Sequence, residues 1–192
     1  MMRRYAVILF LCALACNNKD KEATPPPPPP QPVAGAKYSA AFAQSLDGLL
    51  STYNGVLSGF AKGDTGAIGV TGRLLLSQFD SLSFGDFKSD TIVYQTAVGK
   101  MSDTRTELKG LLGEATLASR RQELNMVSQD LYDLLRTIGY KGKTLFFTEC
   151  ATALGEDRPG DWISFVSDST AVTNPYTGVA GCALVKDSVG VR

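Results

Sequence analysis

The chain has 192 residues, with 19 basic and 19 acidic side chains and no histidine, so its formal net charge is zero. With this balance the chain has no excess of positive charge to attract a nucleic acid, and we expect no nucleic-acid partner. The absence of histidine excludes the Ser-His-Asp and Cys-His nucleophile systems and every histidine-ligated metal site.

Residues 1–16 have the features of a bacterial export signal. Two arginines, Arg3 and Arg4, precede an apolar run over residues 5–14. That run is about half as long as a membrane-spanning helix, which needs roughly 20 apolar residues. Two cleavage sites compete here: residues 13–15 read Ala-Leu-Ala, which suits ordinary signal peptidase, and Ala15-Cys16 resembles the end of a lipobox.

The cysteine count favours the lipobox. Cys12 lies inside the signal, and lipidation of Cys16 would leave the exported chain an even number of free sulfurs, those of Cys150 and Cys182. We therefore expect Cys16 to carry acyl chains that hold the N-terminus in a membrane.

Residues 17–36 are predicted to form a proline-rich tether. Residues 25–30 are all proline, and Pro32 follows closely. A polyproline II helix rises about 3.1 Å per residue, so this stretch would be a stiff spacer of roughly 25 Å. We predict an extended stalk, with a proline-rich ligand for a partner domain as the alternative. The remaining residues, 37–192, are expected to form a single helical-bundle domain.

Four segments of this domain place apolar residues at spacings of three and four, which is typical of amphipathic helices. The predicted helices span residues 38–61, 64–82, 90–115 and 119–138. Gly63 and Gly139 end the first and the last, Asp64 can cap the second, and Ser119 with Gln122 has the spacing of a capping box. The short connections predict an up-down four-helix bundle. The expected core comprises Leu46, Leu50, Tyr53, Leu75, Phe79, Leu108, Leu124, Val127, Leu131 and Leu135.

The helical period stops after Gly142. Residues 144–148 form a short β-prone run, and the rest is rich in glycine, proline, asparagine and aspartate. We predict an all-α fold with an irregular C-terminal tail, which needs a restraint because long structureless segments are rare in compact domains. In an oxidising compartment Cys150 and Cys182 would form that restraint as a disulfide worth about 4 kcal/mol. Ligation of a soft metal by the two thiolates is the alternative.

No catalytic residue is predicted. Glycines at 63, 66, 69 and 72 have neither the phosphate-loop nor the dinucleotide spacing, and we expect a helix whose glycine face packs closely on a neighbour, or a frayed first turn. Two groups of acids, at 80, 86 and 90 and at 156, 157 and 161, lack the order of a calcium loop. We expect them to be solvated loop acids, and nothing selects a carboxylate pair for glycoside hydrolysis.

Three blocks of the tail resemble the signature of a known family. They are residues 150–153 (Cys-Ala-Thr-Ala), residues 160–164 (Gly-Asp-Trp-Ile-Ser) and residues 174–178 (Asn-Pro-Tyr-Thr-Gly), followed by Cys182. They resemble a helical domain of unknown function that is appended to periplasmic adaptor (membrane-fusion) subunits of heavy-metal efflux systems and also occurs as stand-alone lipoproteins. The resemblance implies a lipoprotein facing the periplasm or cell surface of a Gram-negative bacterium, and a link to copper.

The family's histidine and methionines are replaced in this chain, where Glu149 precedes Cys150 and Thr152 follows it at the methionine position. A copper site would therefore use Cys150 and Cys182 with an oxygen from Glu149 or Asp161. For the remaining motif residues of the three blocks we expect structural roles, in which Trp162 packs on the bundle and a turn is closed by Gly178. The residues given such roles are Asp161, Trp162, Asn174, Pro175, Tyr176 and Gly178.

The sequence thus predicts a non-enzymatic, lipid-anchored interaction or accessory module of the cell envelope. Its partners would be the membrane, through the anchor, and an envelope protein. The alternative is a soft-metal binding protein associated with metal efflux, with copper as its metal.

Overall fold

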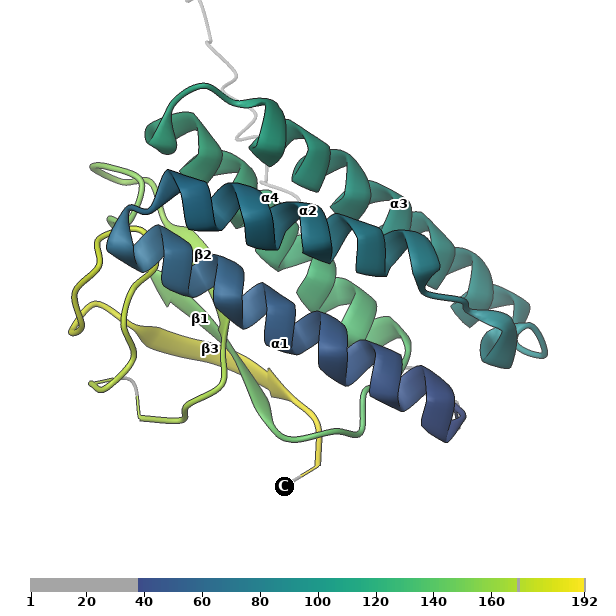
Figure 1. Cartoon of the computed structure of the whole chain (residues 1–192). Coiled ribbons are helices and arrows are strands. Elements are labelled where there is room, and N and C mark those ends of the chain that lie inside the picture. Colours follow the sequence, from purple (N-terminus) through teal and green to yellow (C-terminus); the bar gives the residue numbers. More distant parts are fainter. Residues whose placement is uncertain (1–37, 169, 192) are drawn as a thin grey trace, which may run out of the picture.

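The structure is a computed structural model that describes residues 38–168 and 170–191. Four helices are followed by a small sheet (Figure 1). The elements are α1 (Ala40–Lys62), α2 (Thr65–Ser81), the 3-10 turn η1 (Gly85–Phe87), α3 (Thr91–Gly113), α4 (Leu117–Thr137), β1 (Leu145–Cys150), β2 (Gly160–Ser164) and β3 (Leu184–Val189). The predictions for the signal, for Cys16 and for the tether lie outside the described residues.

The helices begin and end close to the predicted positions because local capping groups fix them. Asp64 Oδ1 accepts a hydrogen bond from Ala67 N–H at 2.9 Å, and α1 ends at Gly63, whose φ of 66° is left-handed. The start of α4 differs from the prediction. Thr116, and not Ser119, is the cap, since Thr116 Oγ1 accepts from Ser119 N–H at 3.0 Å.

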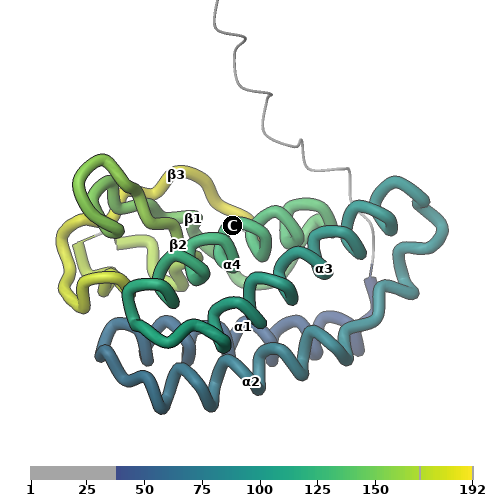
Figure 2. Tube along the Cα trace, turned by 90° about the horizontal axis from the view of Figure 1, so that it is seen from above, coloured from purple at the N-terminus to yellow at the C-terminus, as the bar shows by residue number. Residues whose placement is uncertain are grey.

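Consecutive helices run in opposite directions, so α1 pairs with α2 and α3 pairs with α4 (Figure 1). Viewed from above, the two helical pairs form two layers, with the sheet beside α4 (Figure 2). All ten residues predicted for the core are buried. No described helix is long and apolar enough to span a bilayer.

The predicted fold class is confirmed only in part. The four helices are present, but the fold is not purely all-α, because the tail predicted to be irregular forms a three-stranded antiparallel sheet in the order β2-β1-β3. The β-prone run at residues 144–148 does predict the position of β1. Strand β2 gives no alternating pattern because all five of its residues are buried, and β3 gives little because it is mostly exposed. The two strands that pair with β1 are separated from it by loops, so local sequence could not show the pairing.

Candidate functional site

Cys150 and Cys182 form the predicted disulfide, with their Cα atoms 5.2 Å apart. Cys150 is buried at the end of β1, whereas Cys182 is exposed just before β3. The bridge therefore ties the long loop between β2 and β3 to the end of the central strand.

Strand β2 lies at the edge of the sheet, and side chains from three other elements occupy its outward-facing backbone groups. Asn125 Oδ1 accepts from Asp161 N–H at 2.7 Å, and the Tyr176 hydroxyl donates to the Asp161 carbonyl at 2.5 Å. Ile163 N–H donates to Tyr53 Oη at 3.1 Å. These hydrogen bonds occupy backbone N–H and C=O groups of the β2 edge, which could otherwise pair with another strand.

The Tyr53 hydroxyl joins α1, α4 and β2 in one buried network. Ser128 uses its single hydroxyl proton on the Leu124 carbonyl, at 2.7 Å, so Tyr53 must donate to Ser128 Oγ, at 2.8 Å. The same Tyr53 oxygen accepts from Ile163 N–H. Burial raises the pKa of Tyr53 to about 12, so the hydroxyl stays neutral and keeps its proton for Ser128.

We expect Tyr53→Phe to lower the free energy of unfolding by about 2 kcal/mol, because it leaves the buried Ile163 N–H without an acceptor. Tyr132→Phe is the matched control, since the Tyr132 hydroxyl is also buried but accepts a hydrogen bond from no backbone N–H of the described residues. That variant should change the free energy by less than about 0.5 kcal/mol. Urea unfolding of both variants checks the difference, and equal losses would show that the Tyr53 network contributes nothing.

The Asn174–Gly178 segment folds into a tight turn. Asn174 Oδ1 accepts from Tyr176 N–H at 2.7 Å, and the Asn174 carbonyl accepts from Gly178 N–H at 2.8 Å. Gly178 has a φ of 78°, which favours glycine. The Tyr176 ring meets the Trp162 ring edge-on with centroids 6.1 Å apart, so the turn covers the buried tryptophan.

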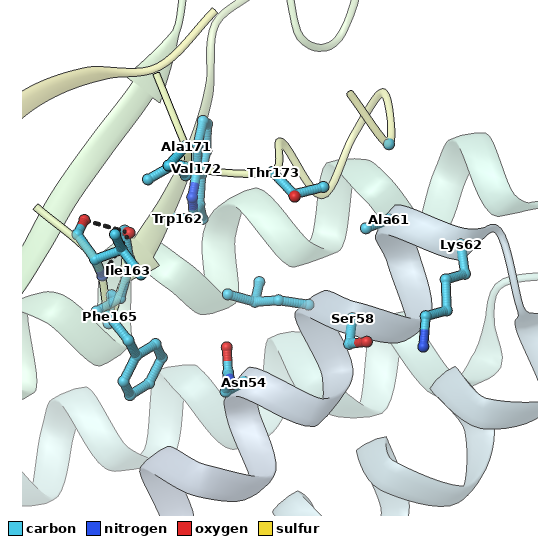
Figure 3. A pocket seen from close by; sticks show the side chains of 14 residues that line it. Asn54, Ser58, Ala61, Lys62, Trp162, Ile163, Phe165, Ala171, Val172 and Thr173 are labelled. Carbon is cyan, nitrogen blue, oxygen red and sulfur yellow. Dashed lines mark hydrogen bonds between the residues drawn. The ribbon is translucent and has the colours of Figure 1, made fainter. Parts of the chain in front are cut away.

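A cleft of about 470 Å³ opens beside this assembly, between α1, the end of β2 and the chain segments at residues 165–166 and 171–173 (Figure 3). We name it the Trp162 cleft. Its apolar lining comes from both sides, with Leu57 and Ala61 on α1 and Phe165 and Val166 on the loop. Phe165 and Val166 are 37% and 49% exposed, and because they are neighbours they form a continuous piece of apolar surface at the cleft. The full lining is Asn54, Leu57, Ser58, Ala61, Lys62, Trp162, Ile163, Ser164, Phe165, Val166, Ala171, Val172, Thr173 and Gly178.

The residues of the copper hypothesis do not converge. The two sulfurs are bonded to each other and offer no thiolate. Glu149 lies opposite Asp161 in the sheet, but it precedes Cys150 on the same strand, and successive side chains on a strand point to opposite faces. Within residues 38–168 and 170–191 no three histidine, cysteine or acidic side chains gather as metal ligands do. The oxidised fold therefore does not fit a soft metal.

The other acids and glycines have local roles. Asp90 caps α3 by accepting from Val93 N–H at 3.1 Å, Asp86 accepts from Ser39 N–H at 2.7 Å, and Asp80 pairs with Arg105. These three are therefore more than solvated loop acids. Of the four glycines that recur at every third position, Gly72 of α2 is buried against α3. A Cβ added at Gly72 would lie 3.0 Å from the side chain of Leu112. The expected close packing is thus limited to that position, since the other three are not buried.

No protein-family model matches the chain, and no curated protein or solved structure matches it either.

Proposed function

We propose that this protein is a non-enzymatic, lipid-anchored accessory module of the cell envelope, and that it docks an extended segment of an envelope protein in the Trp162 cleft. Export and anchoring are supported by the signal over residues 1–16, by the lipobox-like Ala15-Cys16 and by the even number of cysteines that lipidation leaves. A disulfide between the two remaining cysteines suits an oxidising compartment.

The observation that carries the docking proposal is the apolar, exposed lining of the Trp162 cleft. Phe165 and Val166 present apolar surface beside the buried Trp162, so a bound apolar side chain would remove both from water. Each Å² of apolar surface buried contributes about 25 cal/mol. A docked segment would therefore gain affinity from the same residues that are costly to leave exposed.

The shape and charge of the cleft favour an extended peptide bearing a carboxylate. Its lining runs along α1 from Asn54 to Lys62, which is about 12 Å at 1.5 Å per residue. An extended chain covers that length in about four residues. Lys62 is the sole charged residue of the lining, and it makes no ion pair within residues 38–168 and 170–191. An acidic group on the partner would complement it.

Trp162 is the only tryptophan of the chain and lines the cleft, so tryptophan fluorescence comes from a single side chain at the proposed site. Titrating the full chain with a pentapeptide of alternating leucine and glutamate should give a saturable change in emission. A version with glutamine in place of glutamate should bind up to about fivefold more weakly, because an exposed charge pair is worth no more than about 1 kcal/mol.

Two surface variants test whether the peptide binds in the Trp162 cleft. Val166→Ser should weaken the peptide affinity about fivefold by removing apolar contact, whereas Val70→Ser, on the exposed face of α2, should leave it unchanged. A flat fluorescence titration, or equal effects of the two variants, would refute docking in this cleft.

A further inference from the structure

A second cavity, of about 630 Å³, lies between α4 and the sheet, on the side of β2 that faces α4. We name it the Asp161 pocket. One stripe of α4 faces it, because Gln129, Tyr132, Asp133 and Arg136 follow the helical spacing of three and four residues. The sheet provides the other wall, formed by Phe147, Asp161, Lys186 and Asp187.

The carboxylate of Asp161 is only half satisfied. The side chain is 8% exposed, and Gln129 Nε2 donates to Oδ2 at 2.7 Å. The other oxygen, Oδ1, is shielded from bulk water and has no hydrogen-bond partner among the described residues. An unsatisfied buried carboxylate oxygen is costly, because a charged group taken from water needs hydrogen-bond donors.

Tyr132 adds an aromatic wall to the same cavity. Its ring stacks on Phe147, with centroids 4.5 Å apart and planes 20° apart, so it is held in place. The residue is 3% exposed, and burial, followed by the charge of Asp187 and the interaction of the hydroxyl with it, raises the pKa of Tyr132. The pocket thus presents one carboxylate, that of Asp161, with an oxygen that no described residue engages.

The other charges of the pocket are already paired. Asp187 meets Arg136 at 3.4 Å, Lys186 meets Glu149 at 3.2 Å, and Asp133 meets Lys100 at 2.9 Å. Asp161 is the acid of this lining that makes no ion pair in the described structure. A ligand that completes the pocket therefore brings positive charge and N–H donors.

We propose that the Asp161 pocket binds an ammonium or guanidinium group, which donates N–H bonds to the Asp161 carboxylate. The group can belong to a free organic cation or to a lysine or arginine side chain of a partner. This site is separate from the Trp162 cleft, and its test does not use the fluorescence of Trp162.

The test is calorimetric titration of the full chain with methylguanidinium chloride and, in a second arm, with the tripeptide Gly-Arg-Gly. We expect saturable binding of at least one probe, and the stronger arm identifies whether the natural source is a free cation or a side chain. Tetramethylammonium, which has the charge but no N–H donor, should bind at least about tenfold more weakly. Absence of saturable binding in both arms would overturn the proposal.

Asp161→Asn removes the charge while keeping the shape, and it should weaken binding at least about tenfold. Asp103→Asn is the matched control, because it removes an exposed acid from α3, outside the pocket lining, and should change affinity less than about twofold. Equal affinity of Asp161→Asn and the unaltered protein would overturn the proposal.

A pH series on the unaltered protein keeps the test decisive if Asp161→Asn fails to fold. Burial, followed by the neighbouring Glu149, raises the pKa of Asp161, so affinity should fall as the pH drops through that raised value and the carboxylate takes up a proton. An affinity that does not change over that range would contradict binding through Asp161. The titratable and charged groups around it are Tyr53, Tyr132, Asp133, Arg136, Glu149, Tyr176, Lys186 and Asp187.

Discussion

Replacing Cys182 by serine is expected to lower the free energy of unfolding by about 4 kcal/mol, measured by urea denaturation. The bridge joins residues 32 positions apart, and closing a loop of that size removes about this much chain entropy from the unfolded state. Cys182 is the better position to change because it is exposed, whereas Cys150 is buried and a serine there would add an unsatisfied hydroxyl. The loss should be smaller if the reduced tail still packs through Trp162 and Tyr176.

Chemical reduction of the unaltered protein is the control for this variant. Reduction and Cys182→Ser remove the same cross-link, so the two should lower the free energy of unfolding by similar amounts. A variant that loses stability while the reduced protein loses none would assign the effect to packing at Cys182. No loss in either would contradict the view that the disulfide restrains the tail.

Gly178→Ala is expected to cost about 3 kcal/mol or more, because two penalties combine at this position. The φ of 78° is unfavourable for any residue with a Cβ, and that Cβ would run into the carbonyl oxygen of Ala61 at the end of α1. The rigid backbone of a helix cannot move aside as a flexible side chain would. The turn over residues 174–178 would therefore have to leave α1.

Gly181→Ala separates the two penalties. Gly181 also has a positive φ, of 105°, but a Cβ there would meet nothing within 4 Å. We expect this control to show backbone strain alone, about 1–2 kcal/mol, so that the two variants differ by about 2 kcal/mol in thermal or urea unfolding. Equal losses would contradict a close approach of the turn to α1.

The helices could be predicted because their signals are local. Asp64, Gly63 and Gly139 each lie within one helical turn of the helix end that they signal. The apolar spacing of three and four residues places Leu46, Leu131 and their neighbours in the core. The sheet could not be predicted in the same way. Strand β2 is buried on both faces, so its residues show no alternation, and its partner β1 lies across a loop.

The candidate sites were predictable only in part. The disulfide followed from cysteine counting, and the turn followed from the Asn-Pro and Gly178 pattern. The roles of Tyr53 and Gln129 depend on α1 and α4 meeting β2, which no local pattern describes. A tyrosine within a stripe of leucines was the one available signal, because a buried hydroxyl needs a partner.

The central claim is that the disulfide-held tail forms a docking cleft, and the most direct test is the peptide affinity of the oxidised and the reduced protein. Val172, Thr173 and Gly178 line the Trp162 cleft on the chain segment that ends at Cys182. If the bridge holds this wall in place, reduction should weaken binding of the leucine-glutamate pentapeptide about tenfold, followed by Trp162 fluorescence. An affinity that is the same in both redox states would contradict the claim.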